Sequence, residues 1–310
     1  MNQITAYAPA TMANFNVGYD VLGLSLNDIG DEVELTLNGT EENNILEIIN
    51  GKGLPLERDK NCCSVVIRKM QETLNSFKGV DIVITKGFAA GSGLGSSSAS
   101  SAAAAFAYNE LMGKPYSNKE LVAFAAEGER VACGSAHVDN VAPSILGGVV
   151  LSKGKKASDL IQLPLIENLY AVTFFPAIKV NTSDARKILN NTIDLKTLSQ
   201  QVSFMGAFVS SLYEKDIDLF SASLQDLVVE PRRSLLIPRF KELKKAALEN
   251  KALAFGISGS GPSVFAIAKN ADEADHIIKT MEQVYAVLSI KTQAHKHLLC
   301  KDSGARIVKK

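Results

Sequence analysis

A glycine-rich stretch that runs directly into an alanine-rich segment limits the possible folds of this chain more than any other feature. Residues 91–111 read GSGLGSSSASSAAAAFAYNEL. Glycine permits positive φ angles and close approach of other backbone, and alanine is the strongest helix former. A flexible linker would not run without a break into such a segment. We therefore predict a tight loop, then a helix whose small side chains let it pack closely against its neighbours.

The start of this helix predicts a binding site for an anion. The unpaired N–H groups of a first helical turn and the positive end of the helix dipole point at the same place, and serine hydroxyls add donors there. Phosphate is the natural ligand. The stretch lacks the G-x-x-x-x-G-K-[ST] pattern of a P-loop and the spacing of a dinucleotide-binding turn. A plain glycine/serine connector is the alternative interpretation.

Composition limits the kind of partner. The 310 residues include 33 basic and 33 acidic side chains, and 46% of the residues are hydrophobic. Because the charges cancel and no basic cluster is present, we expect a small-molecule partner, no nucleic acid and no membrane. The four cysteines form no C-x-x-C pair, residues 1–15 lack a basic patch followed by a long apolar run, and no apolar run is long enough to cross a membrane. We therefore expect a cytoplasmic protein with free thiols.

The order of expected strands and helices divides the chain in two near the polar turn 153–158. The first part contains expected strands at 31–37, 45–49, 80–85 and 147–152, and expected helices at 62–74, 101–112 and 118–131. The second part contains expected strands at 169–175, 252–257, 263–269 and 286–294, and expected helices at 182–189, 198–213, 218–227, 237–250 and 271–284. This mixture lacks regular βαβ spacing and favours an α+β protein with domains 1–155 and 156–310.

Two further segments carry unusual residue patterns. Residues 256–262, GISGSGP, lie between two apolar runs and predict a tight turn that approaches another loop or a ligand; an ordinary hairpin turn is the alternative. Residues 8–26, APATMANFNVGYDVLGLSL, look too polar for a core and too apolar for a linker.

Taken in order, these three segments resemble the three motifs of the GHMP kinases, the galacto-, homoserine, mevalonate and phosphomevalonate kinases. The matching residues are PATMAN at 9–14 with GYD at 18–20, GSGLGSS at 91–97 and SGSGP at 258–262. Within that superfamily the chain is most similar to the homoserine kinases, on GSAHVDNVAP at 134–143, VNTSDAR at 180–186 and EPRRSLLIP at 230–238. Together these segments extend over nearly the whole chain.

The resemblance implies a two-domain GHMP kinase fold. Its amino-terminal domain would contain a left-handed β-α-β unit and its carboxy-terminal domain a ferredoxin-like α/β sandwich, with ATP between them. The implied reaction, with Mg²⁺, transfers the γ-phosphate of ATP to the side-chain hydroxyl of L-homoserine and gives O-phospho-L-homoserine on the route to threonine. Dimers are frequent among the relatives, so we expect a homodimer.

Homoserine carries an ammonium, a carboxylate and one hydroxyl, so its site needs an acid, one or two arginines and neutral donors. The resemblance pairs Asp20 with the ammonium, Arg186 and Arg233 with the carboxylate, and lines the substrate pocket with Asn14, His137 and Asn140. Taken alone, either arginine would more often form a surface salt bridge.

The resemblance also implies the nucleotide and metal sites. Expected nucleotide-binding residues are Asn61, Lys86, Gly91, Ser92, Gly93, Leu94, Gly95, Ser96, Ser97, Ser98, Gly259 and Ser260. Ser97 and Glu129 are the expected Mg²⁺ ligands, since a carboxylate and a hydroxyl together with phosphate oxygens suit this hard cation. A solvated surface carboxylate is the alternative for Glu129.

Asn140 and Thr182 are the expected catalytic residues. Mevalonate-type relatives carry an aspartate near the acceptor, whereas an amide such as that of Asn140 takes no proton at neutral pH. We expect the neighbouring Asp139 to point elsewhere and Thr182 to approach the γ-phosphate. The prediction is in-line transfer by positioning and electrostatic stabilisation, without a dedicated base.

Three alternatives remain at this point. One is another GHMP acceptor such as mevalonate or a sugar, and a second is a nucleotide-binding regulator without activity. The third is a serine hydrolase, which the absence of a G-x-S-x-G elbow disfavours. His295 and His297 lie in a charged segment, and we expect both to be solvated.

Overall fold

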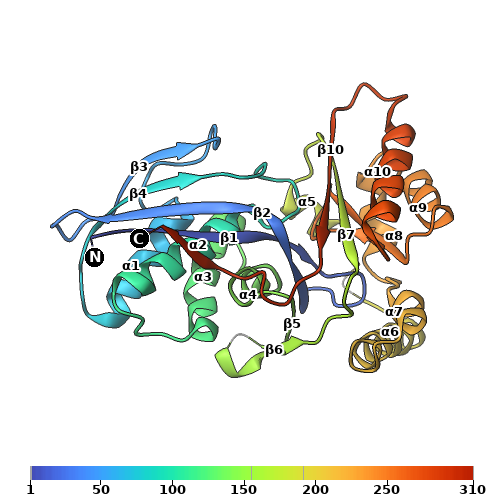
Figure 1. Ribbon diagram of the computed structural model, residues 1–310, viewed down its shortest axis with the longest axis horizontal. Coiled ribbons are helices and arrows are strands. Elements are labelled where there is room, and N and C mark those ends of the chain that lie inside the picture. Colours follow the sequence, from blue (N-terminus) through green and yellow to red (C-terminus); the bar gives the residue numbers. More distant parts are fainter. Residues whose placement is uncertain (1, 155, 191, 310) are drawn as a thin grey trace.

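The computed structural model describes residues 2–154, 156–190 and 192–309. These residues form two β-sheets side by side (Figure 1). Helices α1 to α4 lie against the first sheet, and α9 and α10 lie against the second (Figure 1). The combination of mainly antiparallel sheets with layered helices confirms the expected α+β class.

The first sheet has the strand order β11-β1-β2-β4-β3, and β5 and β6 extend it from β2. Only β3 and β4 pair in parallel among its described strands, and α1 connects them, so these three elements form a β-α-β unit. The bounds of the strands are β1 Gln3–Ala13, β2 Leu22–Leu37, β3 Asn44–Ile49, β4 Val80–Thr85, β5 Val149–Ser152, β6 Leu160–Leu163 and β11 Arg306–Lys309.

The helix after the glycine-rich loop, α2, lies at the centre of the first layer. The helices there are α1 Cys62–Leu74, α2 Ser96–Leu111, α3 Asn118–Cys133 and α4 Val138–Leu146. Residues 102–105 of α2, all alanine, are fully buried, and α2 contacts α1, α3, α4, β1 and β2. The small side chains allow this close packing from several sides, as the sequence predicts, and the packing fixes where the amino end of α2 lies.

The second sheet has the strand order β10-β7-β9-β8 and is antiparallel throughout. Its strands are β7 Tyr170–Pro176, β8 Ala254–Ile257, β9 Val264–Ala268 and β10 Thr292–Leu298. The order fourth, first, third, second is that of a ferredoxin-like sandwich, which confirms that expectation. The helices are α5 Thr182–Lys187, α6 Leu195–Glu214, α7 Ile217–Ser223, α8 Glu230–Arg233, α9 Phe240–Glu249 and α10 Ala271–Tyr285.

A shared apolar cluster joins the two halves. The ring of Phe15 lies 5.5 Å from that of Phe208 in α6 and 5.4 Å from that of Phe265 in β9, between ring centres. Leu22 and Leu24 of β2 belong to the same buried cluster. Burying this much aromatic surface at the junction holds the two halves in one arrangement, so the walls of any pocket between them are fixed.

The boundary that we expect at residues 155 and 156 includes residue 155, which lies outside the described residues. After that position, β6 still pairs with β5, and β11 returns to pair with β1. We therefore propose a division in which the first unit also includes β6 and the carboxy-terminal strand.

Several local expectations need correction. Helix α2 begins at Ser96, five residues before the expected start, and the strand expected at 286–294 is β10, Thr292–Leu298. The helix expected at 218–227 ends at Ser223. His297, which we expected to be solvated, is 1% exposed. Its strand β10 packs against β2 from the other half of the chain, a contact that the local charge pattern does not reveal.

Residues 8–26 are largely buried, so the expectation that they are too polar for a core is also wrong. The polar side chains there are buried because they are hydrogen-bonded: the Asn16 amide donates to the carbonyl of Leu224 at 2.9 Å and to that of Phe255 at 3.0 Å. Satisfied polar groups can be buried at little cost. This segment ties the first sheet to the second.

Candidate active site

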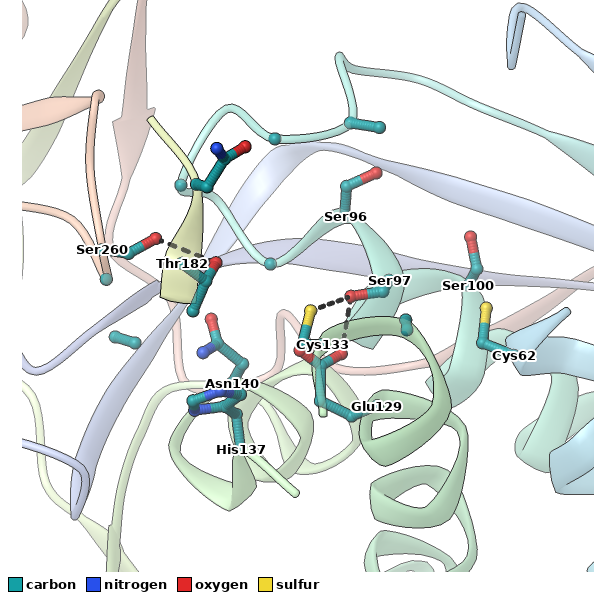
Figure 2. Close-up of a pocket in the computed structure, with 18 of the residues that line it drawn as sticks. Cys62, Ser96, Ser97, Ser100, Glu129, Cys133, His137, Asn140, Thr182 and Ser260 are labelled. Carbon is teal, nitrogen blue, oxygen red and sulfur yellow. Dashed lines mark hydrogen bonds between the residues drawn. The ribbon is translucent and has the colours of Figure 1, made fainter. Parts of the chain in front are cut away.

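A cavity of about 1060 Å³ lies where the two halves meet. The glycine-rich loop and the first turn of α2 form one wall, α3 and α4 form another, and α5 with the turn after β8 forms a third (Figure 2). Every motif that the sequence analysis singles out contributes to this one cavity.

The glycine-rich loop is held in shape by backbone contacts. Gly91, Gly93 and Gly95 have φ angles of 75°, 85° and 69°, as predicted. A Cβ on Gly93 would lie 2.7 Å from the carbonyl oxygen of Gly261, so only glycine fits where the two loops touch. The Ser258 hydroxyl donates to the Gly93 carbonyl at 2.8 Å. The third motif therefore supports the loop of the second.

The serines of this loop divide into two groups. Ser96 and Ser97 line the cavity, and the buried Ser96 hydroxyl has no hydrogen-bond partner among the described residues. Ser98 is fully buried and donates to Glu129 at 2.7 Å, and the Ser92 hydroxyl accepts from the Leu94 N–H at 3.4 Å. Ser92, Leu94 and Ser98 are outside the cavity lining, so their side chains shape the loop.

Lys86 and Asn61 line the cavity, but their polar atoms are already bonded. The Lys86 ammonium pairs with Asp31 and donates to the Ser96 carbonyl at 2.9 Å and the Ser100 hydroxyl at 2.8 Å. Burial raises the pKa of Asp31, and Lys86 opposes that shift. Asn61 caps α1 by accepting from the Cys63 N–H at 3.0 Å. Both residues therefore position their neighbours.

Glu129 is a buried carboxylate that faces the start of α2. It is 3% exposed and accepts a hydrogen bond from Ser97 at 2.7 Å (Figure 2). It accepts a second one from Ser98, also at 2.7 Å. No lysine or arginine pairs with it in the described part of the chain. A buried carboxylate with a hydroxyl beside it and no basic partner is an oxygen donor set that suits Mg²⁺. The alternative of a solvated surface group is wrong.

The opposite end of the cavity carries the charges expected for an amino acid acceptor. Arg186 Nη2 lies 3.1 Å from both carboxylate oxygens of Asp20 and 3.4 Å from His137 Nδ1. Burial lowers the pKa of His137, so the ring is neutral at pH 7. The structure thus brings together three of the predicted substrate residues.

Arg233 lies in the same wall but has different partners. It is 3% exposed, its Nε donates to the Ala185 carbonyl at 3.1 Å, and its Nη1 donates to the Gly259 carbonyl at 2.8 Å. Its guanidinium also lies over the ring of Tyr19. No carboxylate pairs with it among the residues described. A buried guanidinium that is bonded only to carbonyls is prepared for an anionic ligand.

Neutral side chains lie between the two ends. Asn140 Oδ1 accepts from the Thr11 hydroxyl at 2.9 Å, and Asn14 donates to the Gly259 carbonyl at 3.0 Å. The Thr182 and Ser260 hydroxyls are 3.3 Å apart (Figure 2). Asn140, Thr182 and Ser260 therefore come from three elements but meet around the middle of the cavity.

Asp139 is a site residue that the sequence analysis missed. We expected it to point elsewhere, but it lines the cavity and is 3% exposed, with Oδ1 4.0 Å from His137 Nδ1. Burial, and then the nearby charge of Asp20, raises its pKa to about 7. The error arose because this segment is the first turn of α4, where neighbouring side chains diverge by only about 100°. Thr11, in the first motif, is a second omission.

The fold and the cavity together define a small-molecule kinase of the GHMP type. Residues 61–148 match the family of GHMP kinases N terminal domains, and residues 208–287 match GHMP kinases C terminal. A homoserine kinase of Chlorobium phaeobacteroides is 41% identical over 99% of this chain and 100% of its own length. One of Methanococcus maripaludis is 39% identical over 90% of each chain.

Comparison with solved structures supports the same family. The crystal structure of a homoserine kinase from Cytophaga hutchinsonii matches with a TM-score of 0.95 and 40% identity over 99% of this chain and 98% of that one. The chain therefore belongs to the homoserine kinase family of GHMP kinases. An L. major mevalonate kinase matches with a TM-score of 0.69 at 14% identity, which shows the shared fold alone.

Proposed function

We propose that this protein transfers the γ-phosphoryl group of ATP to the side-chain hydroxyl of L-homoserine and forms O-phospho-L-homoserine. Full-length relatives named as homoserine kinases support this activity. The observation that carries it in the structure is the placement of Asp20, Arg186 and the unpaired Arg233 at one end of a cavity whose other end is a glycine-rich helix start. These groups suit a zwitterion and a polyphosphate.

The acceptor binds through its two charges. Asp20 takes the ammonium, and Arg186 and Arg233 take the carboxylate. Because both charges are held at one end, the hydroxyl of homoserine extends toward the middle of the cavity, where Asn140 and Thr182 lie. Asn140 Oδ1 already accepts from Thr11, which leaves the amide nitrogen to donate to the acceptor.

The triphosphate binds at the opposite end. The N–H groups at the start of α2 and the Ser96 hydroxyl face the cavity, and they supply donors for the charge that develops on the transferred group. Lys86 acts indirectly, since its ammonium holds the Ser96 carbonyl and so the position of the first helical turn.

Glu129 and Ser97 would hold Mg²⁺. The fit rests on the buried Glu129 carboxylate, which accepts from the Ser97 and Ser98 hydroxyls and pairs with no lysine or arginine among the residues described. When bound, the cation neutralises charge on the phosphates. The protein's own contribution is to hold the Glu129 oxygens at the first turn of α2.

We propose that no side chain acts as the base. Asn140 cannot accept a proton, and Asp139 lies within 4.8 Å of both Asp20 and His137, at the end of the cavity that binds the ammonium. Holding the hydroxyl in line with the γ-phosphoryl group supplies the rate enhancement, and the proton leaves late, to phosphate or solvent.

The homodimer stays a prediction, as does the cytoplasmic location. Exposed apolar residues along α6 support self-association: Leu195 is 82% exposed and Val202 is 61% exposed. The four cysteines are free, which suits a reducing compartment. No helix in the described ranges is long and apolar enough to span a bilayer.

A coupled assay of ADP release tests the proposal. Homoserine, mevalonate and galactose are offered separately with ATP and Mg²⁺, and we expect turnover with homoserine alone. Turnover with either other acceptor would contradict the assignment of the charged end. Binding of ATP without ADP release from any acceptor would favour a regulator.

A further inference from the structure

Two of the groups proposed to bind homoserine are bonded to each other. Asp20 presents both carboxylate oxygens to Arg186 Nη2, each at 3.1 Å, across the cavity from α5 to the turn before β2. The pair is accessible, since the Arg186 side chain is 37% exposed and the Asp20 side chain is 39% exposed. Arg186 Nε is buried and has no hydrogen-bond partner in the described part of the structure.

Arg233, unlike Arg186, is not paired with a carboxylate in the described part of the chain. Its guanidinium binds two carbonyls and no carboxylate among the residues described, so it can accept an anion without losing an ion pair. Arg186 cannot use Nη2 for a ligand carboxylate until it releases Asp20. The same holds for Asp20 and an ammonium group.

We propose that the Asp20–Arg186 ion pair occupies the place of the acceptor's zwitterion, and that the acceptor must break this pair to bind. This inference rests on the proposed function. A zwitterion replaces one ion pair by two and brings no net charge. A ligand with a single charge only exchanges one pair for another and leaves Asp20 or Arg186 without a partner. Because of this ion pair, the site favours a ligand that carries both an ammonium and a carboxylate over a ligand that carries only one of them.

The short helix α5 connects the Asp20–Arg186 ion pair to the middle of the cavity, where Thr182 lies. Arg186 lies four residues after Thr182, on the same face of α5. Thr182 contacts Ser260, and the Ala185 carbonyl between them is held by Arg233. Release of Arg186 from Asp20 therefore changes the contacts of the helix that carries Thr182.

The test uses two fragments of homoserine and two variants, with calorimetric binding to the nucleotide-bound enzyme. 3-Aminopropan-1-ol lacks the carboxylate, and γ-hydroxybutyrate lacks the ammonium. Arg186→Met frees Asp20 and should bind aminopropanol about threefold or more tighter than the parent enzyme. Asp20→Asn frees Arg186 and should tighten hydroxybutyrate similarly. Asn suits this position because Asp20 has a φ of 59°.

Both variants should bind homoserine itself more weakly than the parent does. Each variant should therefore show a lower affinity for homoserine together with a higher affinity for one fragment. Lys187→Met is the matched control: it removes a 79% exposed cation from the same helix and should change neither fragment. Circular dichroism and the thermal midpoint check folding.

A gain in both variants supports the inference. It is overturned if either variant shows no gain for its fragment while the parent binds homoserine, or if Lys187→Met gives the same gain. If the parent enzyme does not bind homoserine at all, the proposed function fails first and this inference fails with it.

Discussion

The two ends of the cavity differ in the groups that line them: one is formed mainly by backbone and the other mainly by charged side chains. The phosphate end is made of backbone: three glycines with positive φ, a loop that contacts Gly261 and Ser258, and the first turn of α2. The acceptor end is made of charged side chains: Asp20 pairs with Arg186, Arg233 donates to carbonyls, and Asp139 lies beside His137. One end is held by steric fit, and the other by balanced charge.

The difference teaches which changes each end tolerates. Backbone donors cannot be exchanged by mutation, so the phosphate end is altered only through what surrounds it. Charged side chains can be exchanged one at a time, and each exchange leaves a partner unpaired. Damage at one end should therefore appear in the kinetics of one substrate and spare the other.

Loss of Glu129 should have the largest effect. Glu129→Gln removes the carboxylate that faces the start of α2, where charge neutralisation contributes several kcal/mol, so we expect kcat to fall by about 10²-fold or more. The homoserine KM should change little. Steady-state kinetics over a series of Mg²⁺ concentrations measure the effect.

Glu127→Gln is the control, because that residue lies on the same helix but pairs with the surface Arg130. Equal kcat values for Glu129→Gln and the parent would contradict the assigned metal site.

Arg233→Ala tests the acceptor end. An unpaired substrate carboxylate should weaken homoserine binding by roughly 2 to 5 kcal/mol, seen as a raised homoserine KM with ATP affinity nearly unchanged. The change also removes the bonds to Ala185 and Gly259, so the thermal midpoint should drop. Arg232→Ala, at the exposed neighbouring position, should do neither. If ATP binding weakens as much as homoserine binding, then Arg233 has a structural role.

Asp139→Asn tests the charge balance through pH. The folded pKa of about 7 lies above the ordinary value of 3.8, so the folded state holds this proton more tightly than the unfolded state. The stability that this proton contributes is complete below pH 4 and is lost as pH rises through 7. The stability of the variant should therefore match that of the parent at pH 4 and exceed it above pH 7, by roughly 4 kcal/mol.

Denaturant unfolding of Asp139→Asn and the parent at several pH values gives the comparison. A constant difference across this range would show that Asp139 does not hold a proton in the folded protein.

Gly93→Ala tests steric fit at the phosphate end. The added Cβ would lie 2.7 Å from the Gly261 oxygen and 2.9 Å from that of Ser258, at a φ of 85°. We expect a loss of about 1–3 kcal/mol in stability and a raised ATP KM. Gly91→Ala meets nothing within 4 Å, so it isolates the cost of positive φ alone, about 1 kcal/mol. If the two variants behave alike, contact between the loops does not shape the phosphate end.

Asn140→Asp tests whether the transfer gains from a base, and it also removes the amide N–H proposed to donate to the acceptor. A carboxylate there can still accept from the Thr11 hydroxyl, and we expect no gain in kcat because the transfer does not depend on a base. The pH profile of kcat measures this. A clear gain that titrates as one carboxylate would show that a base at this position does accelerate the reaction.

Much of the fold could be predicted from the sequence because it depends on local pattern. The helix at 62–74 and the strand at 80–85 have the predicted bounds. The strand at 286–294 was misplaced, and β11 was not foreseen. Its residues, Arg306–Lys309, gain their strand character from pairing with β1 at the other end of the chain. No local window contains that information.

The candidate site shows the same division. The three motifs and the segment 134–143 predicted that Asn14, Gly93, Asn140 and Ser260 come together, and these residues line one cavity. They did not predict that Lys86 is bonded to Asp31, or that Asp139 faces the cavity beside His137. Ser98 looked equivalent to Ser97 in the sequence, yet it is fully buried.

By itself, the sequence determined where the backbone can take positive φ, which segments form helices and which charges are available, because these depend on residue type and near neighbours. Only the tertiary structure decided which of those charges remain free for a ligand. Lys86 meets Asp31 from 55 positions away, and Arg186 meets Asp20 from 166. Pairing energy depends on distance in space, and packing between remote segments sets that distance.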